Sequence, residues 1–109
     1  MARDKGLEEL VQHELASVRG ITEKAMFGGW AWLLRGHLLC GARTGSLLVR
    51  LGKGLDGWAL EIDGVVPMQM RGRTMSGWVR CGPPVYAQDA LRARLLARAV
   101  DFVRTLPAK

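Results

Sequence analysis

The stretch MFGGWAWLLRGHLLCGARTGSLLVRLG, residues 26–52, decides the fold. Within it, three apolar segments lie at residues 30–34, 37–43 and 46–51. They are separated by Arg35-Gly36 and Thr44-Gly45, and short breaks of this kind are typical of tight hairpin turns, because glycine readily adopts a positive φ. The stretch therefore predicts an antiparallel meander. It also raises a question of function, since two tryptophans stand in it beside several arginines.

The segments that flank this meander predict a second hairpin and two helices. Arg71-Gly72 joins residues 65–70 to residues 73–81 in the same manner. Apolar residues at helical spacing predict a helix over residues 5–18 and a second helix from Gln88 to the residue before Pro107. Residues 52–64 fit either a helical turn or a loop. The predicted fold class is α+β, an antiparallel meander and hairpin sheet flanked by N-terminal and C-terminal helices.

Two-residue turns would fix which residues share a face of the sheet. They pair Leu33 with Leu38, Ala31 with Cys40, Cys40 with Val49, Ala42 with Leu47 and Leu38 with Leu51, all on one apolar face. The reverse face then carries Trp30, Trp32, Arg43 and Arg50. In the second hairpin the same construction groups Val66, Met68, Met70, Met75 and Val79 with Arg73, with Arg80 on the reverse face. A three-residue turn with a bulge would shift the register, but the uniformly apolar face favours two.

The composition is that of a folded globular protein. The 109 residues fit one domain, residues 1–109, and 49% of them are hydrophobic. Two cysteines, Cys40 and Cys81, are too few for a disulfide framework, and the N-terminal residues contain no apolar signal core. No apolar run approaches a membrane span, which needs about 20 residues. We therefore expect a cytoplasmic protein with no membrane partner.

The chain is basic, with a formal net charge of +6. The excess of bases begins at Arg35, and such a charge attracts polyanions, although an arginine-rich composition can equally reflect a GC-rich coding sequence. The predicted C-terminal helix carries Arg94, Arg98, Asp101 and Thr105 along one outer edge. An acid among the bases predicts a salt-bridged, solvated face there rather than a DNA-recognition helix.

No set of residues in the sequence indicates a reaction or a metal. His37 and Cys40 would lie on opposite faces of their strand, and Asp56, Glu61 and Asp63 are better explained as turn and surface groups. The glycine-rich segments match neither the dinucleotide-binding nor the phosphate-loop pattern. We therefore expect no enzymatic activity, no cofactor and no metal site.

The face with tryptophans and arginines is the positive feature of the sequence, and three interpretations of it stay open. Aromatic rings beside arginines can stack on bases while the charges follow a nucleic-acid backbone. The same residue types are enriched at the centres of protein interfaces. The face can also be buried under the second hairpin within the same chain.

Several short motifs resemble the TfoX/Sxy N-terminal domain family, in its branch of short stand-alone bacterial members. They are Met26-Phe27-Gly28-Gly29, Arg71-Gly72-Arg73 with Met75, and Gly77-Trp78-Val79, and the resemblance runs from Leu7 to Pro107. It implies an α+β domain whose antiparallel sheet is flanked by terminal helices, with no catalytic residues, and its motif positions look structural as readily as functional. In longer relatives this domain precedes a second domain and regulates competence genes together with the cyclic-AMP receptor protein at promoters.

Together, these observations predict a non-enzymatic regulatory module linked to transcription regulation through protein–protein contacts. We expect the partner to bind the face that bears Trp30, Trp32, Arg43 and Arg50. Direct nucleic-acid binding through the same face is the first alternative, and small-molecule sensing, with residues 52–64 as its only support, is the second. Homodimerisation through a sheet face or edge is compatible with all three.

Overall fold

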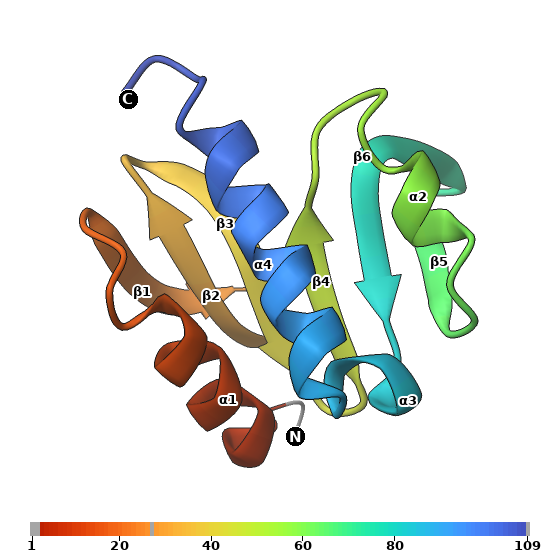
Figure 1. Ribbon diagram of the computed structural model, residues 1–109, viewed down its shortest axis with the longest axis horizontal. Helices are drawn as coiled ribbons and strands as arrows, with labels where there is room; N and C mark the ends of the chain where they lie inside the picture. Colours follow the sequence, from red (N-terminus) through yellow and green to blue (C-terminus); the bar gives the residue numbers. More distant parts are fainter. Residues whose placement is uncertain (1–2, 27, 109) are drawn as a thin grey trace.

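The computed structural model describes residues 3–26 and 28–108 and shows an antiparallel sheet with all its described helices on one face (Figure 1). The six described strands are β1 (Ile21–Met26), β2 (Gly29–Leu34), β3 (His37–Arg43), β4 (Ser46–Arg50), β5 (Val65–Met70) and β6 (Arg73–Cys81). The helices are α1 (Lys5–Leu15), α2 (Gly57–Leu60), α3 (Pro83–Tyr86) and α4 (Asp89–Val103). The strand order is β1-β2-β3-β4-β6-β5, so the predicted α+β class is confirmed.

Two elements differ from the sequence-based expectation. Strand β1 adds an edge that the pattern did not indicate, because its four central residues are all exposed and show no alternation. Helix α1 ends at Leu15 rather than at residue 18, and the open segment 52–64 contains the single turn of α2. At the start of α1, the Asp4 carboxylate accepts a hydrogen bond of 3.1 Å from the backbone N–H of Leu7, a standard helix cap.

A bulge in β3 changes the predicted faces of the first meander. The pairs Leu33–Leu38, Cys40–Val49 and Ala42–Leu47 form as predicted. Ala31, however, pairs with Gly41 and Trp32 pairs with Cys40, so the predicted Ala31–Cys40 pair is wrong. The described β3–β4 ladder runs only from Cys40–Val49 to Arg43–Ser46 and does not include the predicted Leu38–Leu51 pair. The extra residue is Leu39, which is fully buried beside Cys40, because a bulge allows two consecutive side chains to point into the core.

A larger irregularity divides β6. Pro67 of β5 pairs with Val79, but the next residue, Met68, pairs with Met75, so residues 76–78 of β6 bulge out of the ladder between β5 and β6. The predicted grouping of Val79 with the methionines is therefore wrong, since Val79 is fully buried in the core. Arg80 pairs with Val66 on the other face of the sheet, where the prediction had separated the two.

Gly77 holds this bulge in place. It adopts φ +89°, and its carbonyl accepts hydrogen bonds from the backbone N–H groups of Leu51 (2.7 Å) and Gly52 (3.0 Å). Its own N–H donates to the Asp56 carboxylate at 3.1 Å. A Cβ at this position would lie 2.5 Å from the carbonyl carbon of Gly52, so only glycine fits.

The core lies between the sheet and the helices, and a buried arginine joins the helices to one another. The Arg92 side chain of α4 donates to the Tyr86 carbonyl at 2.8 Å and to Asp89 Oδ1 at 2.8 Å. It also reaches Glu14 Oε1 of α1 at 3.3 Å. Because Arg92 is only 3% exposed, these partners compensate a charge that would otherwise be costly to bury. The apolar core includes Leu7, Val11, Trp32, Leu39, Val49, Val79, Leu95 and Val103.

Two glycines with positive φ, Gly72 in the turn before β6 and Gly77 in its bulge, allow the contribution of the bulge to stability to be measured. We predict that Gly72→Ala lowers the free energy of unfolding by about 1–2 kcal/mol, because Gly72 has φ +77° but a Cβ there would meet open space. Gly77→Ala should cost on the order of 1–3 kcal/mol more, because the added Cβ also overlaps the backbone of Gly52. Urea denaturation of the two variants measures the difference, and equal losses would show that the contact with Gly52 does not constrain the fold.

Candidate functional site

The four residues predicted to form one partner-binding face lie in different places. Trp32 is 0% exposed and belongs to the core, so it cannot contact a partner of the folded protein. Trp30 lies on the helix side as well, where its Nε1 donates to Glu23 Oε1 at 2.8 Å and the Arg3 guanidinium covers its ring at 4.4 Å. The cause is the bulge at Leu39, which pairs both tryptophans with core positions of β3.

The two predicted arginines are also separated. The Arg50 guanidinium lies 4.9 Å from the centre of the Trp78 ring and 5.6 Å from that of Phe102 in α4. Burial lowers the pKa of Arg50, although the rings compensate part of its lost hydration. Arg43 instead is exposed on the face of the sheet away from the helices. Of the predicted set, only Arg43 therefore lies on a surface without helices.

That surface can be followed across the sheet by its cross-strand pairs. Ala31 pairs with Gly41, Gly41 with Leu48, Leu48 with Arg80, and Arg80 with Val66, so the five residues form one row on the face opposite the helices. Leu48 at its centre is 2% exposed, whereas Val66 at the edge is 54% exposed. Ala31 at the opposite end is 1% exposed, so the row is covered by other side chains at Ala31 and Leu48 and is most open at Val66.

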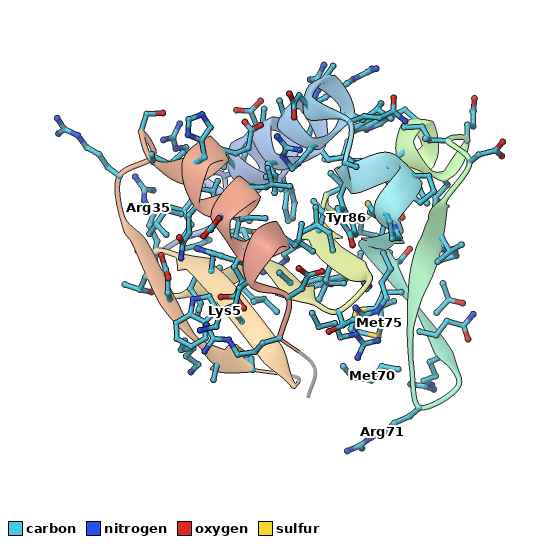
Figure 2. All side chains as sticks on the ribbon, turned by 90° about the horizontal axis from the view of Figure 1, so that it is seen from below. Lys5, Arg35, Met70, Arg71, Met75 and Tyr86 are labelled. Carbon is cyan, nitrogen blue, oxygen red and sulfur yellow. The ribbon has the colours of Figure 1, made fainter. Side chains whose placement is uncertain are left out.

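Methionines extend this row along the second hairpin. Met68 and Met75 form a pair, and β5 alternation places Met70 on the same side. Figure 2 shows Met70 and Met75 on the inner side of the hairpin, below the central strands, with Arg71 at the hairpin tip. We call the surface formed by Arg43, Leu48, Val66, Met70, Met75 and Arg80 the helix-free face.

The charges of the helix-free face are uncompensated. The Arg80 guanidinium donates to Ser46 Oγ at 3.1 Å, and burial together with the nearby positive charge of Arg43 lowers the pKa of Arg80. Within residues 3–26 and 28–108, the ion pairs involve only Arg3 and Arg92, so neither Arg43 nor Arg80 has a carboxylate partner there. Sequence reasoning missed Arg80 because nothing in the pattern marks the bulge that turns it to this face.

A groove lies between residues 51–58 and α4, apart from the helix-free face. It has a volume of about 780 Å³ and is lined by Leu51, Gly54, Leu55, Gly57, Trp58, Arg94, Arg98, Asp101, Phe102 and Thr105. The predicted salt bridges along this edge of α4 do not form among the described residues. Arg94 instead stacks on Trp58, with its guanidinium 4.4 Å from the ring centre.

The motif residues of the family resemblance have identifiable structural roles. Gly28 (φ +74°) turns the chain into β2, and a Cβ on Gly29 would overlap the carbonyl oxygen of Ala42. Arg71 (φ +54°) and Gly72 form the tip of the second hairpin, and Gly77 forms the bulge. Met26 ends β1, Arg73 begins β6, and Trp78 stacks with Arg50. Phe27 lies outside the described residues.

Comparison with models of known protein families shows the family of this chain. The family model of the TfoX N-terminal domain matches residues 13–103. This chain belongs to the TfoX N-terminal domain family. The resemblance drawn from the motifs is therefore confirmed. No curated protein and no solved structure matches the chain.

The groups that could carry chemistry in this TfoX N-terminal domain are dispersed or buried. Among the described residues, no three His, Cys, Asp or Glu side chains come together in a way that could hold a metal ion. His37 Nε2 lies 2.6 Å from the carbonyl oxygen of Pro107 and holds the segment after α4 against β3. None of the described helices is both long and apolar enough to cross a membrane.

Both cysteines of the domain are buried, and we predict that neither reacts in the native state. Burial raises the pKa of Cys81 to about 12 and also raises the pKa of Cys40, so the thiolate is scarce at neutral pH. Labelling with a thiol reagent at pH 8 should be at least about a hundredfold slower for native than for urea-unfolded protein.

The same shifts in the cysteine pKa values make the free energy of unfolding depend on pH in the alkaline range. In the unfolded chain the thiols lose their protons from about pH 8.5 upward, whereas in the folded domain they keep them. The free energy of unfolding should therefore fall as the pH rises from about 8.5 toward 12, and Cys81→Ala should weaken this slope. Burial of the thiols would be contradicted if the thiol reagent labelled the native protein as fast as the unfolded protein.

Proposed function

We propose that this TfoX N-terminal domain is a non-enzymatic regulatory module that binds an acidic segment of a protein partner on its helix-free face. The observation that carries the proposal is the neighbouring pair Arg43 and Arg80, two guanidinium groups that share a sheet face without a carboxylate partner among the described residues. Family membership supports a regulatory role of the competence-regulator type. We extend it to transcription regulation in the bacterial cytoplasm.

The charges favour a carboxylate as the group that is bound. Two like charges side by side repel each other, and Arg80 is in addition partly desolvated. A bound carboxylate would relieve both costs, and a guanidinium can hold it through two parallel hydrogen bonds. Ser46 already fixes one end of the Arg80 group, so less side-chain freedom would be lost on binding.

The apolar part of the face favours a protein over a nucleic acid. Val66, which pairs with Arg80, and Met70, near the tip of the same hairpin, are both exposed, and methionine side chains adapt readily to different protein surfaces. The tryptophans of the first meander, which would have been stacking platforms for bases, lie on the other side of the sheet. The formal charge of +6 still makes nucleic acid the competitor that an experiment has to include.

Fluorescence anisotropy with two labelled probes tests the proposal. One probe is a glutamate- and leucine-rich peptide and the other is a DNA duplex of mixed sequence, each titrated at low and at physiological salt. We expect the peptide to bind more tightly than the duplex at physiological salt. The double variant Arg43→Ala/Arg80→Ala should weaken peptide binding by about tenfold or more, the loss expected for charge-assisted hydrogen bonds.

The control is Arg19→Ala, which removes an exposed arginine from the loop between α1 and β1. It should leave the affinity for the peptide within about twofold of the wild type, since an exposed charge far from the site contributes little. Tight duplex binding that falls steeply with salt would replace the protein partner by nucleic acid. Equal effects of the double variant and the control would remove the helix-free face as the site.

A further inference from the structure

We propose that the groove between residues 51–58 and α4 binds a flat, largely apolar small molecule that carries a carboxylate. The site is separate from the helix-free face and does not depend on the function proposed above. It lies on the helix side of the sheet, between α4 and the segment that leads into α2, which stand beside each other in Figure 1. Small-molecule sites of proteins are typically clefts of about 300–1,000 Å³, and the volume of about 780 Å³ falls within that range.

The floor and walls of the groove are apolar and partly aromatic. Leu51 is 1% exposed and forms the floor, while Trp58 and Phe102 are partly buried on opposite walls. Leu55 on the rim is 56% exposed, the largest exposed fraction among the large hydrophobic residues described. A flat apolar molecule would cover this leucine and contact both rings, and the removal of this apolar surface from water favours binding.

Two arginines give the groove its charge preference. Arg94 and Arg98 lie one helical turn apart on α4, and neither forms an ion pair among the described residues. The Arg94 guanidinium lies over the Trp58 ring, 4.4 Å from its centre, and no carboxylate among the described residues pairs with its N–H groups. The Thr105 hydroxyl donates its proton to the carbonyl of Phe102 at 2.6 Å, so the two arginines, and not this hydroxyl, would donate to a bound carboxylate.

Asp101 is the one acidic side chain in the lining, and its position limits its effect. It also lines a smaller groove on the other side of α4, together with Glu14 and Arg104. Asp101 therefore lies at the boundary between the two grooves, whereas Arg94 and Arg98 line only the larger one. The lining keeps a net positive charge, which selects an anion over a cation.

The wall opposite α4 is fixed before any ligand binds. The bonds of Gly77 to Leu51, Gly52 and Asp56 anchor both ends of the loop, and the Leu55 N–H donates to the Gly52 carbonyl at 2.9 Å. A Cβ on Gly52 would lie 2.5 Å from the Phe102 ring, so the loop also packs closely on α4. A preformed site loses little entropy on binding, which favours affinity for a small ligand.

Nuclear magnetic resonance titration with naphthalene-2-carboxylate tests the proposal, with 2-naphthylmethanol as the uncharged control. We expect the carboxylate to shift the backbone amide signals of Gly54, Leu55, Gly57 and Thr105. The affinity for the alcohol should be at least about tenfold lower, because the alcohol cannot form charge-assisted hydrogen bonds with the arginines. Arg98→Ala should weaken binding of the carboxylate about tenfold, and Arg19→Ala should not change it.

The aromatic wall is tested by a conservative pair of variants. Trp58→Phe keeps a ring at the wall and should retain binding within about threefold, whereas Trp58→Ala should lose it. If Trp58→Ala does not fold, Trp58→Phe and Arg98→Ala still decide the question. No shift at millimolar carboxylate, shifts spread over the helix-free face, or equal binding of the alcohol would each overturn the proposal. Because Arg43 and Arg80 do not line the groove, failure here leaves the protein-binding proposal standing.

Discussion

The backbone of Gly77 is the constraint on which both candidate sites depend. Its carbonyl and N–H tie β6 to the end of β4 and to the loop before α2, and no other residue type fits without displacing Gly52. On one side of this point, Val79 and Cys81 face the core. On the other side, Met75 faces away from the helices. The same hydrogen bonds tie to β6 the loop that forms the groove wall opposite α4.

The two surfaces differ in chemistry, which supports a division of roles between them. The helix-free face combines the neighbouring Arg43 and Arg80 with methionines of the second hairpin, and we propose it for a protein partner. The groove is lined by Trp58 and Phe102 and by two arginines of α4, and we propose it for a small anion. Phe102 lies between the groove and the sheet, because its side chain lines the groove and the Arg50 guanidinium of β4 lies over its ring.

Much of the fold could be predicted from sequence, and the errors have two physical causes. The turns at Arg35-Gly36 and Arg71-Gly72 marked their hairpins, because positive φ demands particular residues, and the apolar spacing marked α1 and α4. Bulges leave no comparable signature. The extra residue at Leu39 moved Trp32 into the core, and the bulge at Gly77 exchanged the faces of Val79 and Arg80. The exposed strand β1 was missed because edge strands need no alternation.

The candidate site was harder to predict than the fold for the same reason. A site depends on which side chains share a face, and a shift of one residue exchanges every face. Arg43 was placed correctly away from the helices, whereas Arg80 and the groove required the three-dimensional arrangement. The middle segment 52–64, whose structure the sequence left open, supplies one wall of that groove through Leu55 and Trp58.

The most direct test of the central claim is the methyl spectrum of the five methionines during titration with the acidic peptide. Met70 and Met75 lie on the helix-free face and report on it without any mutation. The account predicts that their methyl signals shift together as the peptide binds and stay in place when naphthalene-2-carboxylate is added. Peptide binding that leaves both signals unchanged would contradict the assignment of this face as the site of protein recognition.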